Sequence, residues 1–589
     1  MVNKLILKSK KLLTAPQSSI FSAATIIMVM VTASKFLGFI RQRTLFTFFS
    51  PADTDLFLAA FELPDLIFEI FVYGILSAAF IPVFSKYLSR GKEKEAWHVA
   101  VSSLNLLLVV FATFALLVFV FANPLYSLIT GGFAKDVVGA SGGFTDAQVS
   151  VVVSISRLLL LAQMFFVISS FLTGVLESFK RFLIPALAPI LYNLGIIFGI
   201  VFLSPSLGIY GPAIGVLIGA LAHLLVQLPL ARHLGFRMKL VLDLRHPGVR
   251  RMIKLSIPRV IELAFLQFRR ISWLFLASLF VGGFTYLKSA DLIQTLPIGV
   301  FGLSLAKAAF PTLSQQAGTK DMDGFRNTFS STLNQVFFLV IPFAAFMVVL
   351  RIPVVRLVFG TQQFDWNSTV QTGYALSAFA VGIFAYSGSL LVSRSFYALQ
   401  DTKTPVVFSI LSVIVNVVLA FILVLGFGTG TWGIALSYSV AGILLFIPLL
   451  SILIKRIKLS FSEITIPFIK MLTSAGFASV LMFLILKIFD KSVWIKRLSF
   501  LGSIESAKVI PFETFVLDTR FTVNLIILTA IVVLVGSIAY IGASVALGTK
   551  EVWTTFGFIR RILIKRKIAP VPKDESEIVS PPPSDTSNM

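Results

Sequence analysis

Apolar segments recur along the whole of this 589-residue chain. Each is about 20 residues long, which is the length that an α-helix needs to cross a lipid bilayer. Hydrophobic residues make up 57% of the chain and charged residues 13%, and the mean hydropathy is +0.93, values outside the range of soluble domains. The fourteen segments begin near Ser19, Leu56, Trp97, Ser150, Phe182, Gly211, Met252, Tyr286, Asn327, Thr372, Val406, Trp432, Ile466 and Thr522. The sequence therefore predicts an all-α polytopic membrane protein with about 14 transmembrane helices.

The net charge of +23 would suit a nucleic-acid-binding protein, but the basic residues are distributed as in a membrane protein. They cluster in alternate connections between the apolar segments, whereas short connections such as residues 204–211 carry almost none. By the positive-inside rule, this pattern places both termini in the cytoplasm, and we expect no nucleic-acid partner. The clusters lie at residues 4–11, 86–94, 180–181, 232–254, 320–326, 455–458 and 560–567.

The chain also contains an internal repeat. Residues 176–193 and 399–416 share leucine, lysine and asparagine in register, and Lys403 follows Lys180 by 223 residues. Each copy lies between the predicted fourth and fifth helices of a six-helix unit, with the same orientation in the membrane. We therefore predict two six-helix lobes related by a parallel repeat, followed by two C-terminal helices. Such a pair of lobes is typical of transporters that work by alternating access.

This organisation divides the chain into six parts. A basic cytoplasmic N-terminus is followed by two lobes with a basic cytoplasmic linker between them. Two further helices joined by a long outer loop come next, and the tail is basic at first and then rich in proline, serine and acidic residues, which predicts disorder. The predicted limits are 1–18, 19–236, 237–251, 252–455, 466–547 and 548–589.

Charged residues interrupt the first two apolar segments. A charge at the centre of a bilayer costs about 2.5–3.5 kcal/mol on insertion scales, so such residues usually face a cavity or a partner. On the first helix, Ser34, Lys35, Gly38, Arg41 and Gln42 fall within an arc of about 120°. The second helix starts near Asp55, and an arc of similar width holds Glu62, Asp65, Glu69, Tyr73 and Ser77. We expect these two arcs to line a hydrated interior.

The start of the second lobe carries a comparable set of charges. An arc of about 100° on its first helix holds Arg259, Glu262, Arg269, Arg270 and Trp273. The next helix carries Lys288, Asp291 and Gln294 ahead of Pro297.

Pro64 and Pro297 interrupt the second helix of each lobe at comparable positions. Proline frees a backbone carbonyl that a cavity or a neighbouring side chain must satisfy. We therefore regard Pro64, Pro297 and Gly38 as candidate hinges, although Gly38 also suits simple helix packing.

Four stretches resemble the MviN/MurJ lipid II flippases, which belong to the multidrug/oligosaccharidyl-lipid/polysaccharide exporter superfamily. They lie at residues 34–43 (SKFLGFIRQR), 55–84, 181–193 (RFLIPALAPILYN) and 396–405 (FYALQDTKTP). The resemblance covers roughly residues 19–455. It implies export of an undecaprenyl-pyrophosphate-linked peptidoglycan precursor, lipid II, across the bacterial cytoplasmic membrane, and hence a role in cell-wall biogenesis and cell shape.

The resemblance transfers only in part to the site residues. Arg41 and Asp55 match family positions, and Asp65 follows Pro64 where the family has asparagine. Lys35 stands where the family has arginine. Other family charges are missing: two arginines correspond to Phe68 and Leu292, and an acidic residue corresponds to Tyr73. Our hypothesis is that Arg269 and Arg270 restore the positive charge from the opposite lobe.

A pyrophosphate headgroup needs cations in a dry site, and arginine offers a fork of donors that matches phosphate oxygens. The predicted headgroup contacts are therefore Arg41 first, then Lys35, then Arg269 and Arg270. The alternative is that Lys35 and Arg41 simply pair with acidic residues and hold the helices together. The remaining polar cavity residues are predicted to be Asp55, Glu62, Asp65, Glu69, Arg259, Glu262 and Asp291.

The same residues are compatible with two other transport functions. A flippase for another polyprenyl-pyrophosphate-linked glycan would show the same lobes, and a cation-coupled drug exporter would use an acidic, aromatic cavity. No catalytic motif is present, so we expect no enzyme. The chain has no cysteine and only scattered histidines, and we expect neither a metal site nor a cofactor. Without an ATPase motif, the energy must come from the membrane potential or an ion gradient. The buried acids suit Na⁺ or H⁺ equally, and the sequence does not predict an oligomeric state.

Overall fold

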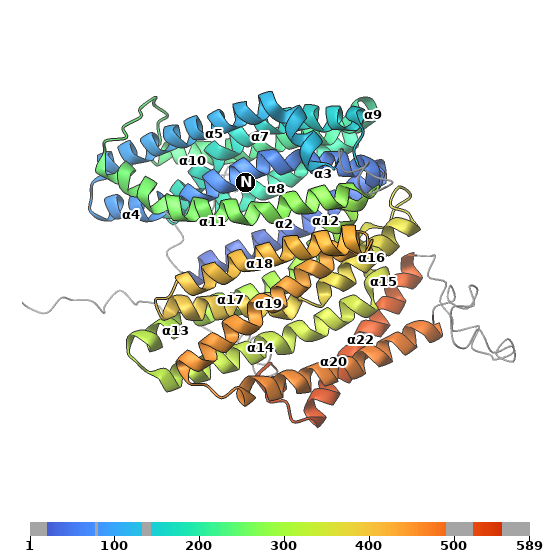
Figure 1. Ribbon diagram of the computed structural model, residues 1–589. Coiled ribbons are helices and arrows are strands. Elements are labelled where there is room, and N and C mark those ends of the chain that lie inside the picture. Colours follow the sequence, from blue (N-terminus) through green and yellow to red (C-terminus); the bar gives the residue numbers. More distant parts are fainter. Residues whose placement is uncertain (1–19, 77–79, 132–142, 490–521, 556–589) are drawn as a thin grey trace, which may run out of the picture.

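The computed structural model describes residues 20–76, 80–131, 143–489 and 522–555, and all of them fold into helices and their connections (Figure 1). The predicted N-terminal segment, most of the long outer loop and the acidic tail lie outside these residues. The first group of helices comprises α2 (Ile20–Phe48), α3 (Pro51–Phe68), α4 (Ile81–Ser89), α5 (Glu93–Ile129), α7 (Asp146–Ser178), α8 (Leu183–Phe198), α9 (Ser204–Leu207) and α10 (Tyr210–His233).

The helices that follow form a second group, which packs beside the first, and α11, the first of them, runs along the first group (Figure 1). It comprises α11 (Pro247–Ser278), α12 (Gly283–Pro297), α13 (Ser304–Gly318), α14 (Met322–Val349), α15 (Arg351–Phe359), α16 (Trp366–Ala380), α17 (Ile383–Ala398), α18 (Lys403–Phe421), α19 (Thr431–Ile457), α20 (Ser462–Phe489) and α22 (Thr522–Ala546).

All fourteen predicted apolar segments are helical where the structure describes them. Ten of the described helices are long and apolar enough to cross a membrane, and the bent pair of α16 and α17 makes an eleventh. The helices α3 and α11 carry several charged residues each, which lowers their hydropathy. The chain is therefore an all-helical, multi-pass membrane protein.

Within each group, one helix packs against several others. In the first group α10 packs against α7 and α8, while α2 packs against α8 and α3 against α7. In the second group α19 contacts α16, α17 and α18, and α14 and α22 both contact α20. The helix α11 touches both groups, since it contacts α5 on one side and α18 on the other. The exact limits of the two lobes stay a prediction.

Glycine allows α8 and α10 to approach each other closely. A Cβ atom added to Gly195 would lie 2.4 Å from the Cα atom of Gly219, and one added to Gly199 would lie 2.6 Å from the Cα atom of Gly215. Small residues at such spacing bring helix backbones together in membranes, where van der Waals packing replaces the hydrophobic effect between helices. The two backbones are therefore in direct contact.

Four described π-helical segments occur in two matched pairs. The first pair follows the second helix of each predicted lobe: η1 (Glu69–Tyr73) continues α3, and η5 (Ile298–Leu303) continues α12. The second pair is η4 (Gly199–Leu203) after α8 and η6 (Ile422–Gly426) after α18. Proline inside or at the end of α3 and α12 removes a backbone donor, and a wider turn is a common local response.

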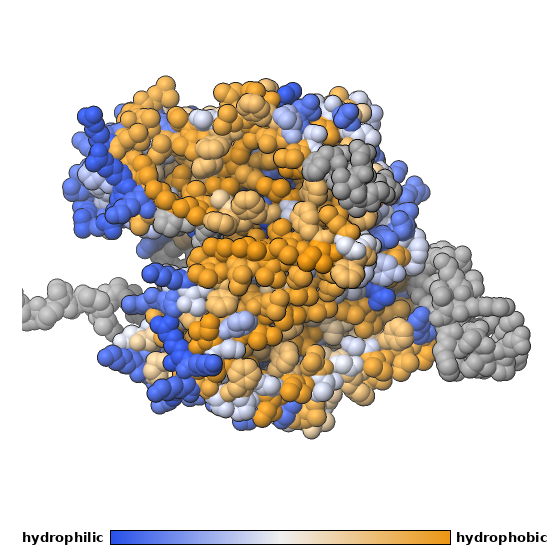
Figure 2. Space-filling view, viewed as in Figure 1, coloured by the Kyte–Doolittle hydropathy of each residue, from blue (hydrophilic) through white to orange (hydrophobic). Residues whose placement is uncertain are grey.

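The surface separates into an apolar flank and polar ends (Figure 2). Hydrophilic side chains gather at the end of the bundle where α4 meets α5 and where α13 meets α14, while an apolar surface covers the helices between the ends (Figures 1 and 2). The described connections at this end include the basic residues 86–94 and 320–326, and we name it the basic end.

Candidate functional site

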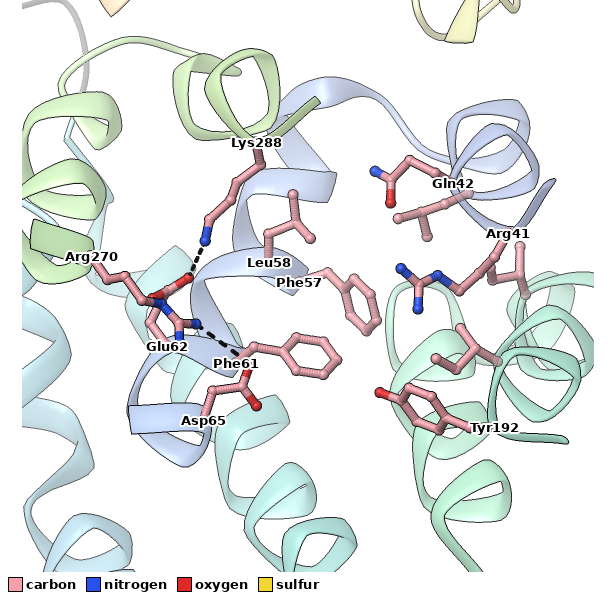
Figure 3. A pocket seen from close by; sticks show the side chains of 13 residues that line it. Arg41, Gln42, Phe57, Leu58, Phe61, Glu62, Asp65, Tyr192, Arg270 and Lys288 are labelled. Carbon is pink, nitrogen blue, oxygen red and sulfur yellow. Dashed lines mark hydrogen bonds and ion pairs between the residues drawn. The ribbon is translucent and has the colours of Figure 1, made fainter. Parts of the chain in front are cut away.

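A cavity of about 240 Å³ lies between the two groups of helices. Its walls come from α2, α3, α8 and η4 of the first group and from α11 and α12 of the second (Figure 3). Aromatic and aliphatic side chains surround a few charged ones, as in many ligand sites. The lining residues are Arg41, Gln42, Leu45, Phe57, Leu58, Phe61, Glu62, Asp65, Tyr192, Ile196, Ile200, Arg270 and Lys288.

Glu62 is the most buried charge of this cavity, with 4% of its surface exposed. Two cations from the second group neutralise it: Nε of Arg270 lies 3.0 Å from one carboxylate oxygen, and Nζ of Lys288 lies 2.8 Å from the other. A carboxylate buried at this depth is stable only when it is paired and hydrogen-bonded. The pairing therefore connects α3 to both α11 and α12.

Arg270 also reaches two further carboxylates. Its guanidinium lies 3.5 Å from Asp65 and 2.7 Å from Glu69, measured between nitrogen and oxygen. An amide supports each acid: Gln163 donates to Asp65 over 2.7 Å, and Gln267 donates to Glu69 over 2.9 Å. We name Glu62, Asp65, Glu69, Arg270 and Lys288 the acidic network, because three carboxylates face two cations in it.

Arg41 faces the acidic network from the opposite wall of the cavity (Figure 3). One of its terminal nitrogens donates to the side-chain oxygen of Asn193 over 3.1 Å, and Asn193 in turn donates to the carbonyl of Pro189. Within the described residues, Arg41 forms no ion pair with a carboxylate. This arrangement holds the guanidinium of Arg41 at the cavity surface by a hydrogen bond to an uncharged side chain, without a paired carboxylate among the described residues.

Lys35 lies on α2, outside the lining of the cavity, and is exposed. Its Nζ atom is 3.5 Å from the position that a Cβ atom would take on Gly299, in η5 of the second group. Among the described residues it pairs with none of the acids. The alternative in which Lys35 and Arg41 serve only as partners of these acids is therefore not the arrangement found here, since Arg270 and Lys288 take that place.

Arg269 points into the second group, away from the cavity lining. Its guanidinium lies over the rings of Trp273 and Tyr438, at 5.7 and 5.2 Å from their centroids. Trp273 donates to Asn416 over 3.3 Å. Neighbouring arginines of α11 thus have different partners: aromatic rings hold Arg269, and carboxylates hold Arg270.

Asp55 lies outside the cavity, at the end of the bundle opposite the basic end. Its carboxylate accepts a hydrogen bond of 2.6 Å from the backbone N–H of Thr285 at the start of α12, and Thr285 donates to the carbonyl of Pro51. Thr361 hydrogen-bonds to the carbonyl of Phe46 in the same region. We name these contacts the outer clasp, because they join the two groups at this end.

The remaining predicted residues are dispersed. Asp291 accepts a hydrogen bond of 2.8 Å from Gln294 on its own helix, and Arg259 is half-buried on α11, where it interacts with other groups of the protein. The side chain of Glu262 lies outside what the structure describes. A Cβ atom on Gly38 would meet nothing within 4 Å, so close packing does not require glycine there.

Sequence reasoning named Lys288 among the charges of the second lobe without assigning it to the site, and it missed Gln163, Tyr192 and Asn193. Gln163 is a polar residue within a long apolar run, and such residues usually face a partner. Asn193 was visible only as a landmark of the repeat.

The sequence profile of the family "Lipid II flippase MurJ" matches residues 46–504. The chain belongs to the MurJ family. A "probable lipid II flippase MurJ" of Bdellovibrio bacteriovorus is 29% identical over 428 residues, covering 72% of this chain and 80% of that protein. The "lipid II flippase MurJ" of Burkholderia cenocepacia is 26% identical over 444 residues, covering 73% and 84%. The chain is thus a transporter of this family and not an enzyme.

Two solved structures show the same fold. "Lipid II flippase MurJ, inward closed conformation" superposes with a TM-score of 0.67 at 21% identity, covering 87% of this chain and 98% of that one. An inward-facing multidrug resistance MATE family transporter of the MOP superfamily superposes with a TM-score of 0.59 at 16% identity, covering 73% and 98%. The predicted membership of the MurJ family is confirmed.

Proposed function

We propose that this protein carries lipid II across the bacterial cytoplasmic membrane, with the pyrophosphate-linked headgroup passing through the central cavity and the polyprenyl tail remaining in lipid. The family match over residues 46–504 supports the substrate class. The observation that carries the proposal is Arg41, a guanidinium that faces the cavity and whose side-chain hydrogen-bond partner among the described residues is the uncharged Asn193. Its fork of donors suits phosphate oxygens.

The other cations take graded roles in this proposal. Lys35 meets the headgroup on its way from the basic end, as a point charge without a fork. Arg270 and Lys288 add positive charge from the second group, but they reach an anion only when Glu62 releases them. Arg269 contributes at longer range, because Trp273 and Tyr438 hold it behind the cavity wall.

The acidic network could couple transport to an ion gradient or to the membrane potential. Its three carboxylates and two cations leave one negative charge formally uncompensated, which a proton or a sodium ion could balance. Moving one charge across the membrane potential is worth about 2.3 kcal/mol per 100 mV. We place the basic end and both termini in the cytoplasm, so that the outer clasp closes the far side of the membrane.

The decisive experiment measures binding of the purified full-length protein to lipid II in competition with another polyprenyl-pyrophosphate-linked sugar and with a cationic drug. The variants are Arg41→Ala and the matched Arg41→Lys, which keeps the charge and removes the fork. We expect selective lipid II binding, about tenfold or more weaker in Arg41→Ala and intermediate in Arg41→Lys.

Each alternative gives a different result in the same experiment. Equal preference for the second polyprenyl-linked sugar would indicate a flippase for another glycan. Preference for the cationic drug, lost on Glu62→Gln rather than on Arg41→Ala, would indicate a drug exporter that uses the three carboxylates of the acidic network.

A further inference from the structure

A second cavity, of about 470 Å³, opens on the flank of the first group near the basic end. Its apolar walls include Ile168 of α7, Leu228 of α10 and Met238 of the segment that connects α10 to α11. Two arginines, Arg232 and Arg237, line the same cavity. It shares no residue with the central cavity, so the substrate path described above does not account for it.

The two arginines are available for an anion. Arg232 lies in the last turn of α10 and Arg237 follows five residues later, and both are exposed. Neither side chain hydrogen-bonds or pairs with any residue that the structure describes. Two unpaired guanidinium groups beside an apolar wall are complementary to an amphiphile with a phosphate headgroup.

The connection between α10 and α11 is fixed in place although it is not helical. Asn105 of α5 donates to the backbone carbonyls of Lys239 and Val241 over 2.6 and 2.8 Å, and His98 of α5 contacts Asp243 over 3.0 Å. The cavity wall that this connection provides is therefore held against the helices.

The same connection exposes a row of apolar side chains at every second position. Leu240 is 96% exposed and Met238 is 55% exposed, and Leu242 and Leu244 continue the row. Basic residues flank the row, with Arg237 and Lys239 at its start and Arg245 after its end, while Val241 and Asp243 occupy the positions between the leucines. Apolar side chains flanked by basic ones are typical of segments that lie in the interface of an anionic membrane.

We propose that this cavity binds an anionic glycerophospholipid of the leaflet at the basic end. The phosphodiester lies between Arg232 and Arg237, and an acyl chain lies along Ile168 and Leu228. The exposed leucines of the connection rest among the neighbouring headgroups. This proposal depends on the membrane placement given above but not on lipid II as substrate.

The test uses native mass spectrometry on the full-length protein, delipidated and then refilled with phosphatidylglycerol or phosphatidylcholine of identical chains. The test variant is Arg232→Ala/Arg237→Ala. The matched control, Arg251→Ala/Lys254→Ala, removes two exposed cations from the start of α11 outside the cavity. We expect the wild type and the control to retain phosphatidylglycerol selectively, and the test variant to bind it about tenfold more weakly.

A further variant and two competing ligands distinguish a specific lipid-binding site from general electrostatic attraction of anionic lipids. Leu228→Trp keeps both arginines but fills the cavity, and we expect it to lose phosphatidylglycerol as well. Unchanged retention in the test variant, or an equal loss in the control, would overturn the proposal. So would displacement of phosphatidylglycerol by undecaprenyl phosphate at equal concentration, or by inorganic phosphate alone. Lipid II binding is measured on the same variants. We expect it to be unchanged, so that failure of this proposal can be told apart from failure of the proposed function.

Discussion

Arg269 and Arg270 are consecutive on α11, yet they meet opposite surroundings. Sequence periodicity placed both in one arc that faces the interior, and both do lie inside the molecule. Periodicity gives the face of a helix, but it does not tell which partners the rest of the fold brings to that face. The partners come from distant segments: carboxylates of α3 and η1 for Arg270, and an aromatic ring of α19 for Arg269.

Arg270→Ala should destabilise the protein more than Arg269→Ala. Removal of Arg270 leaves buried carboxylates without their shared cation, which costs about 3 kcal/mol or more. Removal of Arg269 forfeits contacts with aromatic rings worth about 1 kcal/mol. The midpoints of thermal unfolding in detergent at neutral pH give the order of stability of the two variants. Arg251→Ala, which removes an exposed arginine, is the control. Equal midpoints for the two variants would contradict the acidic network as described.

Asp401, in the connection between α17 and α18, predicts a pH dependence. The backbone N–H of Thr404 and then its hydroxyl, together with Arg456, hold the pKa of Asp401 below its ordinary value. A lowered pKa contributes stability above the unfolded-state value near 3.9, and this stability is lost as the pH falls through the folded-state value. The stability difference between wild type and Asp401→Asn should therefore be constant from pH 7 to about 5 and vanish in stronger acid. A difference that grows in acid would exclude this role.

At the scale of elements, sequence patterns predicted the existence of the helices well and their register less well. The repeat aligns Lys180 with Lys403, but in the structure Lys403 begins α18, while Lys180 lies in the turn after α7 with a positive φ of 57°. Gln400 takes that turn position in the second copy, with a φ of 61°. The second copy has more residues between this turn residue and its asparagine than the first copy has. Residues that align in sequence, such as Lys180 and Lys403, therefore do not occupy equivalent positions in the structure. The paired π-helical segments could not be predicted from proline alone.

The contact between α8 and α10 gives an element-scale prediction. Gly219→Ala would place a Cβ atom 2.6 Å from the carbonyl oxygen of Tyr192, so the helices must separate and Asn193 must move with α8. We expect a lower unfolding temperature and a shifted Arg41, seen as weaker substrate binding. Gly476→Ala, where a Cβ atom meets nothing within 4 Å, is the matched control and should leave both properties unchanged. Wild-type behaviour of Gly219→Ala would show that the backbone contact is not required.

At the scale of the whole molecule, hydrogen bonds and ion pairs join the two groups at the outer clasp and at the acidic network. Alternating access requires the outer clasp to open during each cycle. The sequence predicted a transporter with two lobes and a polar interior, but it could not predict which end is closed, because that depends on contacts between segments more than 200 residues apart.

A disulfide across the outer clasp should arrest transport. The chain contains no cysteine, so Pro51→Cys/Thr285→Cys can form only the designed bond, and Thr285 already hydrogen-bonds to the carbonyl of Pro51 over 3.0 Å. We expect lipid II translocation in proteoliposomes to stop under oxidation and to recover with a reductant. Each single-cysteine variant should transport under both conditions. Continued transport by the oxidised pair would show that this end does not need to separate.

The double attachment of α11 has a mechanical consequence. Near its start, Val249 packs against Val99 of the first group, and near its end, Trp273 binds Asn416 of the second group. At 1.5 Å per residue, Arg270 lies about 4.5 Å along the axis from the second attachment and about 31 Å from the first. A swing of the two groups therefore makes α11 a lever whose fulcrum is close to the acidic network. The basic end of α11 travels several times farther than Arg270, so a wide opening at that end needs only a small movement at Glu62, enough to release its two cations.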